Sequence, residues 1–518
     1  MLVRKLLLAS VALLSIFSNG ILAQKAKPAA SKTPPSASAA AAARPAYAVP
    51  FVSKMLPNGL QVIVLQDPSV PIVTVELAVR NGSFTESPEF NGLSHLYEHM
   101  FFKPNIAVQL YGCENSEQRA VLAANPICSR ALSMKPKIGD TSYLKDADEV
   151  SVYNGTTREE IVNYFFNTTS QYLSTAIRFI NDSVRFPSFD EQEFENEKKV
   201  VIGEIDRHDA NPYGYLELAM TQKLFYKYPT RKQPAGTRAT VAAATTDMMR
   251  TIQSRYYVPN NSALVVTGDA KPEEVFKLAE QIMGSWERRP VEPFKEFPLV
   301  EHPPLPKSEA VIIEKTASGE EAATQGQNVF LEVGWQGPSI GKDDAATYAA
   351  DVFSYIISQP DSRFQRKLVD SGLAATAGLG YYTQRNVGPI NLLMVTRPDK
   401  AKALLAATYA EIDHFTQPDY FTDDELESAK TILESNDLFD REKASEYAHT
   451  LSFWWSSTGV EYFRNYHAKL RGVTRADINR YIKTYIQGKN HVALALASPD
   501  AKKQAGLTEQ DLIGGGAQ

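Results

Sequence analysis

The sequence predicts an α+β fold in which a mainly antiparallel sheet has helices packed on one face. Residues 60–65 and 72–79 are rich in β-branched residues, and the turn-forming stretch Gln-Asp-Pro-Ser-Val-Pro separates them, which is typical of two joined strands. Long helical patterns follow at 157–184 and at 190–207. Strands followed by segregated helices indicate a layered α+β domain.

An internal repeat predicts a second copy of this domain. The segment Thr245–Tyr256 recurs in outline as Thr474–Tyr485, and at the same offset each copy is followed by an asparagine, Asn261 or Asn490. An apolar strand pattern follows each asparagine. The same order of helix, tyrosine, asparagine and strand in both halves indicates a duplication, and therefore two homologous domains.

The chain is long enough for two domains, and a proline-dense stretch marks a boundary between them. At 518 residues, the chain can bury more than one core. Residues 288–309 lack a periodic pattern and are expected to form an interdomain linker. This boundary predicts a first domain at 50–287 and a second at 310–500, followed by a tail at 501–518.

The N-terminal segment is predicted to direct export. A basic start precedes an apolar run at residues 6–17 and then small residues, so residues 1–23 are expected to be a cleaved signal peptide. The run is short for a membrane span, and a retained anchor is the alternative. Residues 24–49 are rich in Ala, Pro, Lys and Ser and are expected to form a flexible linker. We expect the bacterial periplasm, with extracellular or membrane-anchored locations as alternatives.

The charge balance argues against nucleic acid as a partner. The formal net charge is -6 and the pI is about 5.9, and no basic stripe occurs. An acidic enzyme of peptides or small substrates fits this composition better.

Two of the eight histidines lie four residues apart in the stretch GLSHLYEHMFF, residues 92–102, with a glutamate directly before the second. On a helix, His95 and His99 lie one turn apart on the same face, so both imidazoles can reach one metal ion, with Glu98 beside them. The order His-x-x-Glu-His is the inverse of the commoner His-Glu-x-x-His order of zinc peptidases. A helix whose histidines merely cap or pack is the alternative.

A third ligand is expected from another segment, because catalytic zinc usually takes three protein ligands, commonly two His and one carboxylate. The best source is residues 191–208, where Glu197 and Glu204 are seven residues apart and share a helical face. His208, four residues after Glu204, is a rival ligand near the expected helix end. A solvated face with Glu–Lys pairs is the alternative reading of these carboxylates.

The chain has only two cysteines, Cys113 and Cys128. In an exported protein they are expected to form a local disulfide that closes a loop of about fifteen residues. Two unpaired thiols are the alternative. A cysteine-based metal site is not expected, because no Cys-x-x-Cys pair or nearby histidine accompanies them.

Five stretches resemble, in order, the pitrilysin/insulinase family of inverted-motif zinc metallopeptidases: LPNGLQVIV, VRNGSFTE, GLSHLYEHMFFK, YNGTT and NEKKVVIGEI. The resemblance covers Lys54 to Pro499, and the second half is similar to the non-catalytic repeat of that family. It implies a zinc endopeptidase that hydrolyses peptides or unfolded protein segments. A non-hydrolytic structural or assembly subunit, or a metal-binding partner protein without turnover, is the alternative.

The resemblance also implies roles for single residues. One Zn²⁺ per chain would be held by His95, His99 and Glu204. Glu98 would act as the catalytic base, and Glu197 would be a supporting second acidic residue.

Substrate contacts are implied as well, with two departures from the family pattern. Asn154 would contact the substrate backbone, and Arg366 matches the arginine of a substrate-binding Arg/Tyr segment in the second half. The tyrosine of that segment is replaced by Ala375, and the nearby Tyr381 and Tyr382 are out of register. The spacing between the two motif segments is roughly thirty residues longer than in the family, which predicts a disulfide-containing insertion at about 104–150.

A partner subunit follows from the same resemblance. In the family, two similar halves form half of a clamshell chamber, and a second two-domain unit closes it around the peptide. This chain has the length of the first unit alone. Because the tyrosine is missing, we expect a hetero-dimer with a sister subunit that lacks His-x-x-Glu-His but carries the Arg/Tyr pair, and a homodimer is the alternative.

Overall fold

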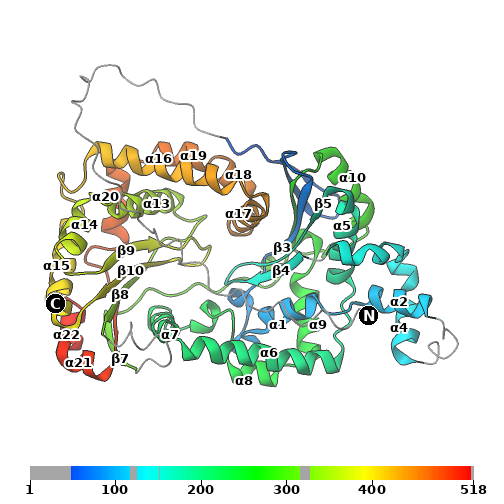
Figure 1. Cartoon of the computed structure of the whole chain (residues 1–518), viewed down its shortest axis with the longest axis horizontal. Helices are drawn as coiled ribbons and strands as arrows, with labels where there is room; N and C mark the ends of the chain where they lie inside the picture. The colour runs from blue at the N-terminus through cyan, green and yellow to red at the C-terminus, as the bar shows by residue number, and fades with distance from the viewer. Residues whose placement is uncertain (1–47, 117–124, 151, 316–326, 515–518) are drawn as a thin grey trace, which may run out of the picture. The chain divides into compact units, whose positions relative to one another are not determined.

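The computed structural model describes residues 48–116, 125–150, 152–315 and 327–514 (Figure 1). The expected signal peptide, most of the following linker and the last four residues of the tail lie outside the described residues. The two sheets described below belong to a single compact unit. Within the described ranges, no helix is both long and apolar enough to cross a membrane.

The first half contains a six-stranded sheet with the order β1-β2-β6-β3-β5-β4. Every neighbouring pair is antiparallel except β2 and β6, which run parallel. The strands predicted at 60–65 and 72–79 are confirmed as β2 and β3. The strand bounds are β1 Val52–Met55, β2 Gln61–Gln66, β3 Ile72–Val79, β4 Val152–Thr157, β5 Val162–Thr169 and β6 Ser262–Gly268.

The second half repeats this sheet with five strands in the order β7-β11-β8-β10-β9. Again one pair is parallel, β7 with β11, and the other pairs are antiparallel. Each of these strands corresponds in order to one of β2 to β6, so the predicted duplication is confirmed. The bounds are β7 Glu309–Glu314, β8 Val329–Gln336, β9 Thr376–Tyr381, β10 Pro389–Thr396 and β11 Val492–Ala497.

Helices pack on the sheets in an order that is also repeated. In the first half they are α1 Leu93–Phe101, α2 Ile106–Asn115, α4 Pro126–Ile138, α5 Leu173–Arg185, α6 Glu191–Ala210, α7 Pro212–Leu224, α8 Arg238–Ala243, α9 Thr246–Tyr256, α10 Pro272–Met283 and α11 Pro293–Glu296. In the second half they are α13 Asp344–Ser358, α14 Arg363–Gln365, α15 Ala401–His414, α16 Asp423–Asp440, α17 Ala444–Ser457, α18 Val460–Arg464, α19 Tyr466–Arg471, α20 Arg475–Tyr485, α21 Pro499–Ala505 and α22 Glu509–Leu512. Thr245 and Thr474 cap the repeated helices α9 and α20.

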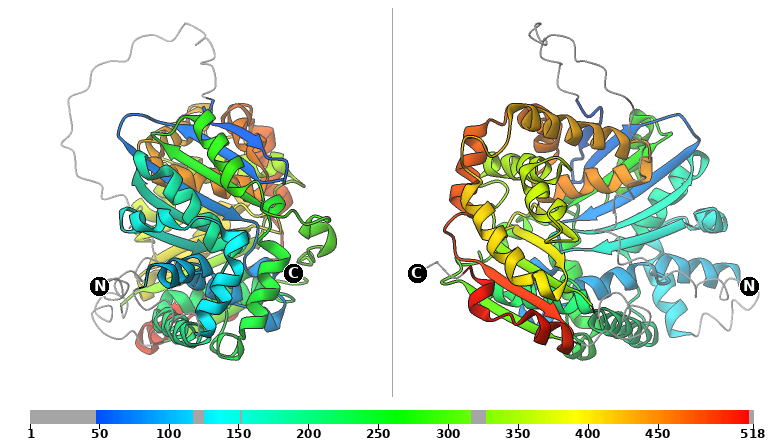
Figure 2. Two further views of the ribbon diagram at one scale, coloured as in Figure 1. Left: turned by 90° about the vertical axis from the view of Figure 1, so that its right-hand side faces the viewer. Right: turned by 60° about the vertical axis from the view of Figure 1, so that its left-hand side comes forward.

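Each half also covers one face of the other half's sheet with a single helix. Helix α17 lies against β3 and β6 of the first sheet, as Figures 1 and 2 show, while α7 lies against β8 and β11 of the second. Leu451 of α17 belongs to the same buried core as Ile63 and Val265, and Leu224 of α7 belongs to the core that contains Phe330. The exchange joins the two halves through apolar side chains that are removed from water.

The helix predicted at 157–184 is wrong in its first half. Residues 162–169 form β5, which pairs with both β3 and β4, and helix α5 begins only at Leu173. The segment Val-Asn-Tyr-Phe-Phe-Asn-Thr-Thr is rich in aromatic and β-branched residues, which fit a pleated surface. Pairing with strands on both sides makes this segment a strand, and the helical pattern in the sequence gave no indication of that pairing. The helix predicted at 190–207 is confirmed as α6.

Candidate metal centre

Helix α1 is held at its N-terminus by a buried glutamate that lies outside the helix. The carboxylate of Glu86 accepts hydrogen bonds from the backbone N–H groups of Gly92 at 2.8 Å and Ser94 at 2.7 Å. Burial raises the pKa of Glu86 to about 7, although these hydrogen bonds oppose the shift. Carboxyl oxygens at a helix N-terminus satisfy its free N–H groups and favour its dipole. Glu86 therefore fixes the start of the helix that carries the histidines.

Gly92 allows the chain to enter α1 in the required direction. Its φ angle is 89°, and a Cβ atom there would lie 2.7 Å from the carbonyl oxygen of Ala235 and 2.8 Å from Cα of Gly236. A larger residue would be strained by the left-handed backbone and would also collide with this segment. The glycine thus lets the segment before α8 pack tightly against the start of the motif helix.

The three proposed ligands lie together between α1 and α6. Nε2 of His95 is 3.6 Å from Oε2 of Glu204, and Nε2 of His99 is 3.4 Å from the same oxygen. The centroids of the two imidazole rings are 4.9 Å apart, and the rings are nearly perpendicular. In the part of the chain that the structure describes, this is the one group of three His, Cys, Asp or Glu donors whose ligand atoms all lie within 4.8 Å of one another.

The donor set fits zinc. Tetrahedral zinc with bond lengths of about 2.0–2.2 Å places neighbouring ligand atoms roughly 3.3–3.6 Å apart, and the two separations above agree with this spacing. Both ring nitrogens of His95 and Oε2 of Glu204 are buried and lack a hydrogen-bond partner. Buried polar atoms without a partner are costly, so their convergence indicates a site shaped for an ion.

The charges around the cluster favour a cation. Burial and the neighbouring His99 lower the pKa of His95 to about 3, so its imidazole is neutral, which is the form that binds metal. Burial also lowers the pKa of His99, but the carboxylates of Glu197 and Glu204 more than offset this and raise it to about 10. Positive charge, from a proton or from a metal ion, is therefore stabilised between these side chains.

Glu98 lies between the ligand cluster and strand β4. Its side chain is buried, and Oε2 accepts a hydrogen bond from Oγ1 of Thr157 at 2.8 Å. A Cβ atom on Gly155 would lie 2.8 Å from Cγ of Glu98, so the glycine allows the strand to approach this closely. Burial raises the pKa of Glu98 to about 7, and a carboxyl with this pKa can accept and donate a proton near neutral pH.

Glu197 supports His99 from the side opposite Glu204. Its Oε2 is 3.0 Å from Nδ1 of His99, and its Oε1 is 2.5 Å from Nζ of Lys103. Burial raises the pKa of Glu197, but the contacts with His99 and Lys103 outweigh it and lower the pKa. A carboxylate on the second ring nitrogen fixes the orientation of a metal-binding histidine.

Three other predicted residues lie outside the donor cluster. His208, near the end of α6, is 3.5 Å from Glu217 and 3.6 Å from Asp209. Asn154 is exposed on β4, and its Oδ1 accepts a hydrogen bond from the next backbone N–H at 2.9 Å. Arg366 lines a surface cavity whose walls all come from the second half, and that cavity contains none of the ligand residues.

The two cysteines lie in a helical hairpin between α1 and β4. Cys113 of α2 and Cys128 of α4 are joined by a disulfide with a Cα–Cα distance of 5.8 Å. A small separate core lies beneath the hairpin, and its buried members are Ile106, Leu110, Ala131 and Phe186. The hairpin therefore has its own small core, separate from the main core of the first half.

Two family models match consecutive parts of the chain. The insulinase (peptidase family M16) model matches residues 61–106 and 147–238, and the peptidase M16 inactive domain model matches residues 243–433. Together they span more than half of the chain. The chain belongs to the pitrilysin/insulinase family. The gap in the first match, between 106 and 147, falls on the hairpin of α2 and α4.

Two bacterial relatives resemble the chain at low identity over most of its length. The zinc protease PqqE of Helicobacter pylori is 21% identical over 441 residues, which is 84% of this chain and 90% of the relative. The uncharacterized zinc protease YmxG of Bacillus subtilis is 22% identical over 393 residues, or 75% of this chain and 84% of the relative. These relatives associate the family fold of this chain with zinc proteases.

Solved structures share the two-domain fold. A protease from Helicobacter pylori superposes with a TM-score of 0.70 at 20% identity, covering 86% of this chain and 99% of that one. The periplasmic protease PqqL from Escherichia coli superposes with a TM-score of 0.64 at 15% identity. That comparison covers 91% of this chain but only 50% of PqqL, so the chain corresponds to one half of the larger protein.

Sequence reasoning assigned no role to three residues that shape the site: Glu86, Thr157 and Lys103. Each lies at the end of a stretch that resembles the family, namely VRNGSFTE, YNGTT or GLSHLYEHMFFK. Their positions in those stretches could have indicated that they matter for the site, but the residues that they contact depend on how different helices and strands pack together. No spacing rule along one helix or strand predicts such contacts.

Proposed function

We propose that this chain is a zinc-dependent endopeptidase that hydrolyses peptides or unfolded protein segments. The observation that carries the proposal is the placement of Glu98, a buried carboxyl, between a two-histidine, one-carboxylate donor cluster and the edge strand β4. The cluster supplies a metal site, the carboxyl supplies proton transfer, and the strand supplies a surface for an extended peptide.

His95, His99 and Glu204 would hold the metal. Zinc bound there would polarise a peptide carbonyl and lower the pKa of a water molecule toward about 7. Glu197 keeps the ring of His99 in its orientation, with Nε2 toward Glu204, through the hydrogen bond to Nδ1.

Glu98 would move the proton. As a carboxylate it takes a proton from the attacking water, and as a carboxylic acid it then gives a proton to the leaving amine. Thr157 holds Oε2 of Glu98 at 2.8 Å, which keeps the carboxyl beside the strand. A pKa of about 7 suits both directions of transfer at neutral pH.

Strand β4 would bind the substrate. Among the described residues it pairs with β5 alone, and the backbone groups of its other side would pair with an added peptide strand. Such main-chain pairing binds peptides with little dependence on their side chains. Asn154, which is exposed on this strand, would contact the peptide backbone.

A partner subunit would complete the chamber. The chain matches 95% of the first half of PqqL, and that protein continues for an equal length beyond it. We propose that a sister chain without His-x-x-Glu-His occupies the second position, with a homodimer as the alternative. The partner would supply the Arg/Tyr pair, because Ala375 of this chain has no hydroxyl to offer. We place the complex in the periplasm, the compartment named for PqqL.

The decisive experiment is digestion of a peptide library by the purified chain, with and without a chelator, alone and with a sister chain. Cleavage that is lost with chelator and restored by zinc supports the proposal. A chain with stoichiometric zinc that cleaves nothing in any combination would instead support a non-hydrolytic subunit of the same fold. A homodimer that cleaves at full rate, with no gain from any sister chain, would rule out the hetero-dimer requirement.

A further inference from the structure

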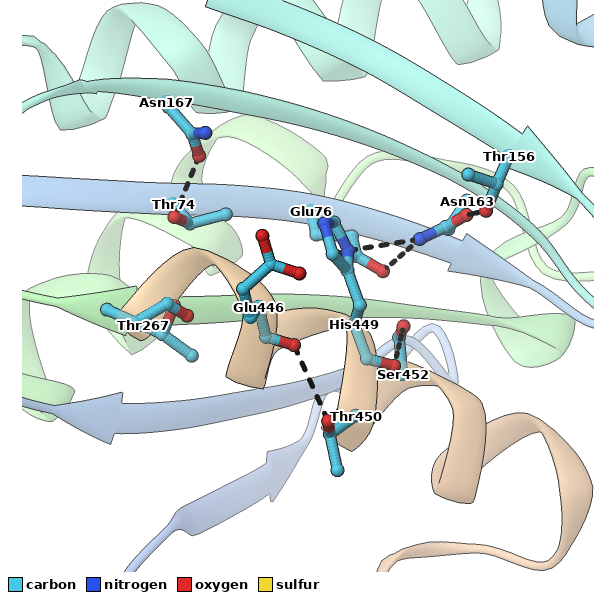
Figure 3. A network of polar contacts seen from close by, with 11 residues as sticks. Thr74, Glu76, Thr156, Asn163, Asn167, Thr267, Glu446, His449, Thr450 and Ser452 are labelled. Carbon is cyan, nitrogen blue, oxygen red and sulfur yellow. Dashed lines mark hydrogen bonds and ion pairs between the residues drawn. The ribbon is translucent and has the colours of Figure 1, made fainter. Parts of the chain in front are cut away.

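A buried carboxylate of the first half binds an imidazole of the second half. Glu76 lies in the middle of β3 and is fully buried, and its Oε2 is 2.6 Å from Nδ1 of His449 on α17. Figure 3 shows these residues and their polar neighbours. A charge that is buried without a partner destabilises a fold strongly. The contact therefore ties α17 to the face of the first sheet that it covers.

The contact continues across the sheet to the edge strand. The second oxygen of Glu76, Oε1, accepts a hydrogen bond at 2.7 Å from Nδ2 of Asn163 on β5. Asn163 stands directly opposite Thr156 of β4, whose Oγ1 donates a hydrogen bond to Oδ1 of Asn163. Contacts in series thus lead from α17 of the second half to β4 (Figure 3).

Strand β4 is also tied to the candidate metal centre, on its opposite face. Successive side chains of a strand point to opposite faces. Thr156 therefore contacts Asn163 on the face covered by α17, while its neighbour Thr157 contacts Glu98 of α1 on the other face. Because β4 has one neighbouring strand in the part of the chain that the structure describes, these side-chain contacts supply restraints that a second neighbouring strand would otherwise provide.

We propose that His449 and Glu76 are positioning residues that hold β4 where a peptide strand paired to it presents its carbonyl beside Glu98. This inference rests on the proposed function, because it takes β4 to be the substrate-binding strand. Neither residue is a ligand of the metal cluster, and both act through Asn163 and Thr156. A strand that is already held in its binding position loses less conformational freedom when a peptide pairs with it, so the loss of these contacts is expected mainly to weaken peptide binding.

The charges around His449 suit this role. Burial lowers the pKa of His449, but Glu76 from β3 and Glu446 from its own helix outweigh it, so the pKa is raised above 6.5. Arg158, which follows β4, opposes the shift, and the ring of Phe165 on β5 packs edge-on at 4.5 Å. The shift is toward the imidazolium form, which pairs best with a carboxylate.

The test is the rate of amide hydrogen exchange in residues 152–157, measured on the full chain by mass spectrometry. His449→Ala leaves Glu76 buried without its partner, and exchange in β4 is expected to accelerate about tenfold, while the rest of the first sheet changes less. In E76Q/H449Q two uncharged amides replace the pair and can hydrogen-bond to each other and to Asn163. This double variant is expected to regain most of the protection.

Kinetics on a cleaved peptide separate positioning from loss of folded protein. His449→Ala is expected to raise KM about tenfold with a much smaller change in kcat and with zinc content unchanged, because peptide binding is weakened and the ligands are untouched. A purely structural defect would lower zinc content and kcat together. Recovery of KM in E76Q/H449Q would again identify the pair as the cause.

Thr450→Ala is the matched control, since Thr450 is the next residue on α17 and its Oγ1 hydrogen-bonds within the helix, to the carbonyl of Glu446 at 3.4 Å. It should leave exchange in β4 unchanged. Three results would overturn the inference. They are an unaltered exchange rate of β4 in His449→Ala, an equal rise in exchange rate across the whole chain, and an exchange rate of β4 in E76Q/H449Q as high as in His449→Ala. Exchange needs no turnover, so a chain that cleaves no peptide would overturn the proposed function while the exchange result still decides whether the pair holds β4.

Discussion

The two halves of the molecule share one topology and differ in what their helices carry. In the first half, α1 and α6 bring two imidazoles and a carboxylate to one point. In the second half, the corresponding helices α13 and α16 also contact each other, but their shared core contains Ala349, Phe353 and Ala429. The same backbone arrangement is a donor cluster in one case and an apolar core in the other. The fold provides the place for a site, and a few side chains decide its chemistry.

The connections between corresponding elements differ as well. Residues 102–151 separate α1 from β4, whereas residues 359–375 separate α13 from β9. The longer connection in the first half contains the disulfide-linked hairpin of α2 and α4. Additional chain is accommodated at the surface without a change in strand order, because long surface connections add little closure entropy.

The largest expected effect is a loss of turnover when Glu98 of the first half is replaced, with no loss from a similar replacement in the second half. Glu98→Gln is expected to lower turnover by about 10²–10⁴-fold while zinc is retained, because it removes proton transfer and leaves the ligands in place. Glu427→Gln, at an exposed position on α16, the counterpart of α6 in the second half, is the control and should alter neither property. Turnover is measured on a library peptide, and zinc by elemental analysis. Near-normal cleavage by the Glu98 variant would refute the mechanism.

The next effect is on zinc binding, and it distinguishes the proposed ligand Glu204 from Glu197, which contacts a ligand. Glu204→Gln should weaken zinc binding by more than the roughly 10–100-fold expected of an outer partner such as Glu197, because it removes an anionic ligand. Zinc dissociation constants of both variants, measured by competition with a chelator, check this order. An equal loss of zinc affinity in the two variants would contradict the assignment of Glu204 as a ligand.

The exchanged helices should be of similar importance in both halves. Leu224 on α7 is 0% exposed and Leu451 on α17 is 1% exposed, and each packs against the sheet of the other half. Replacing either with alanine is expected to cost about 2–5 kcal/mol of unfolding free energy. Denaturant unfolding followed by circular dichroism measures both. A loss in one variant and none in the other would contradict the symmetry of the exchange.

Removing the disulfide tests whether the hairpin is an independent addition. Cys113→Ser with Cys128→Ser opens a loop with a sequence separation of 15, and the chain-entropy model assigns such a loop about 3 kcal/mol. The loss should be local to α2 and α4, with zinc content unchanged. Thiol titration of the denatured protein should detect no free thiol before reduction. Two reactive thiols in protein from its native compartment would refute the bond there.

The smallest effect is a pH dependence of the contact between the halves. The pKa of His449 is raised in the folded protein, so its stabilising contribution is fully present below about 6.5, the unfolded value, and is lost as pH rises through the folded pKa. The stability difference between the wild type and E76Q/H449Q should shrink over that rise. Unfolding free energies at a series of pH values measure it. A difference that is constant with pH would show that the imidazole does not titrate against Glu76.

Much of the candidate site could be predicted because its parts repeat along single helices. His95, Glu98 and His99 lie within one turn of α1, and Glu197 and Glu204 lie two turns apart on α6, so helical spacing alone placed each set on a face. The strand β5 was predicted as a helix because its pairing with β3 and β4 joins residues far apart in the chain. Local patterns do not record such pairings.

By itself, the sequence determined the duplication, the strands β2 and β3 and helix α6, because these follow from local periodicity and residue chemistry. It also placed His95 and His99 on one helical face, and the choice of Glu204 as the third proposed ligand came from the resemblance to the family. Only the tertiary structure decided that Glu86 caps α1, that Lys103 binds Glu197, and that Glu76 meets a histidine from the other half. These contacts join residues on different elements, and their distances depend on how whole helices and sheets pack. Side-chain spacing along one element carries no information about its partner across the core.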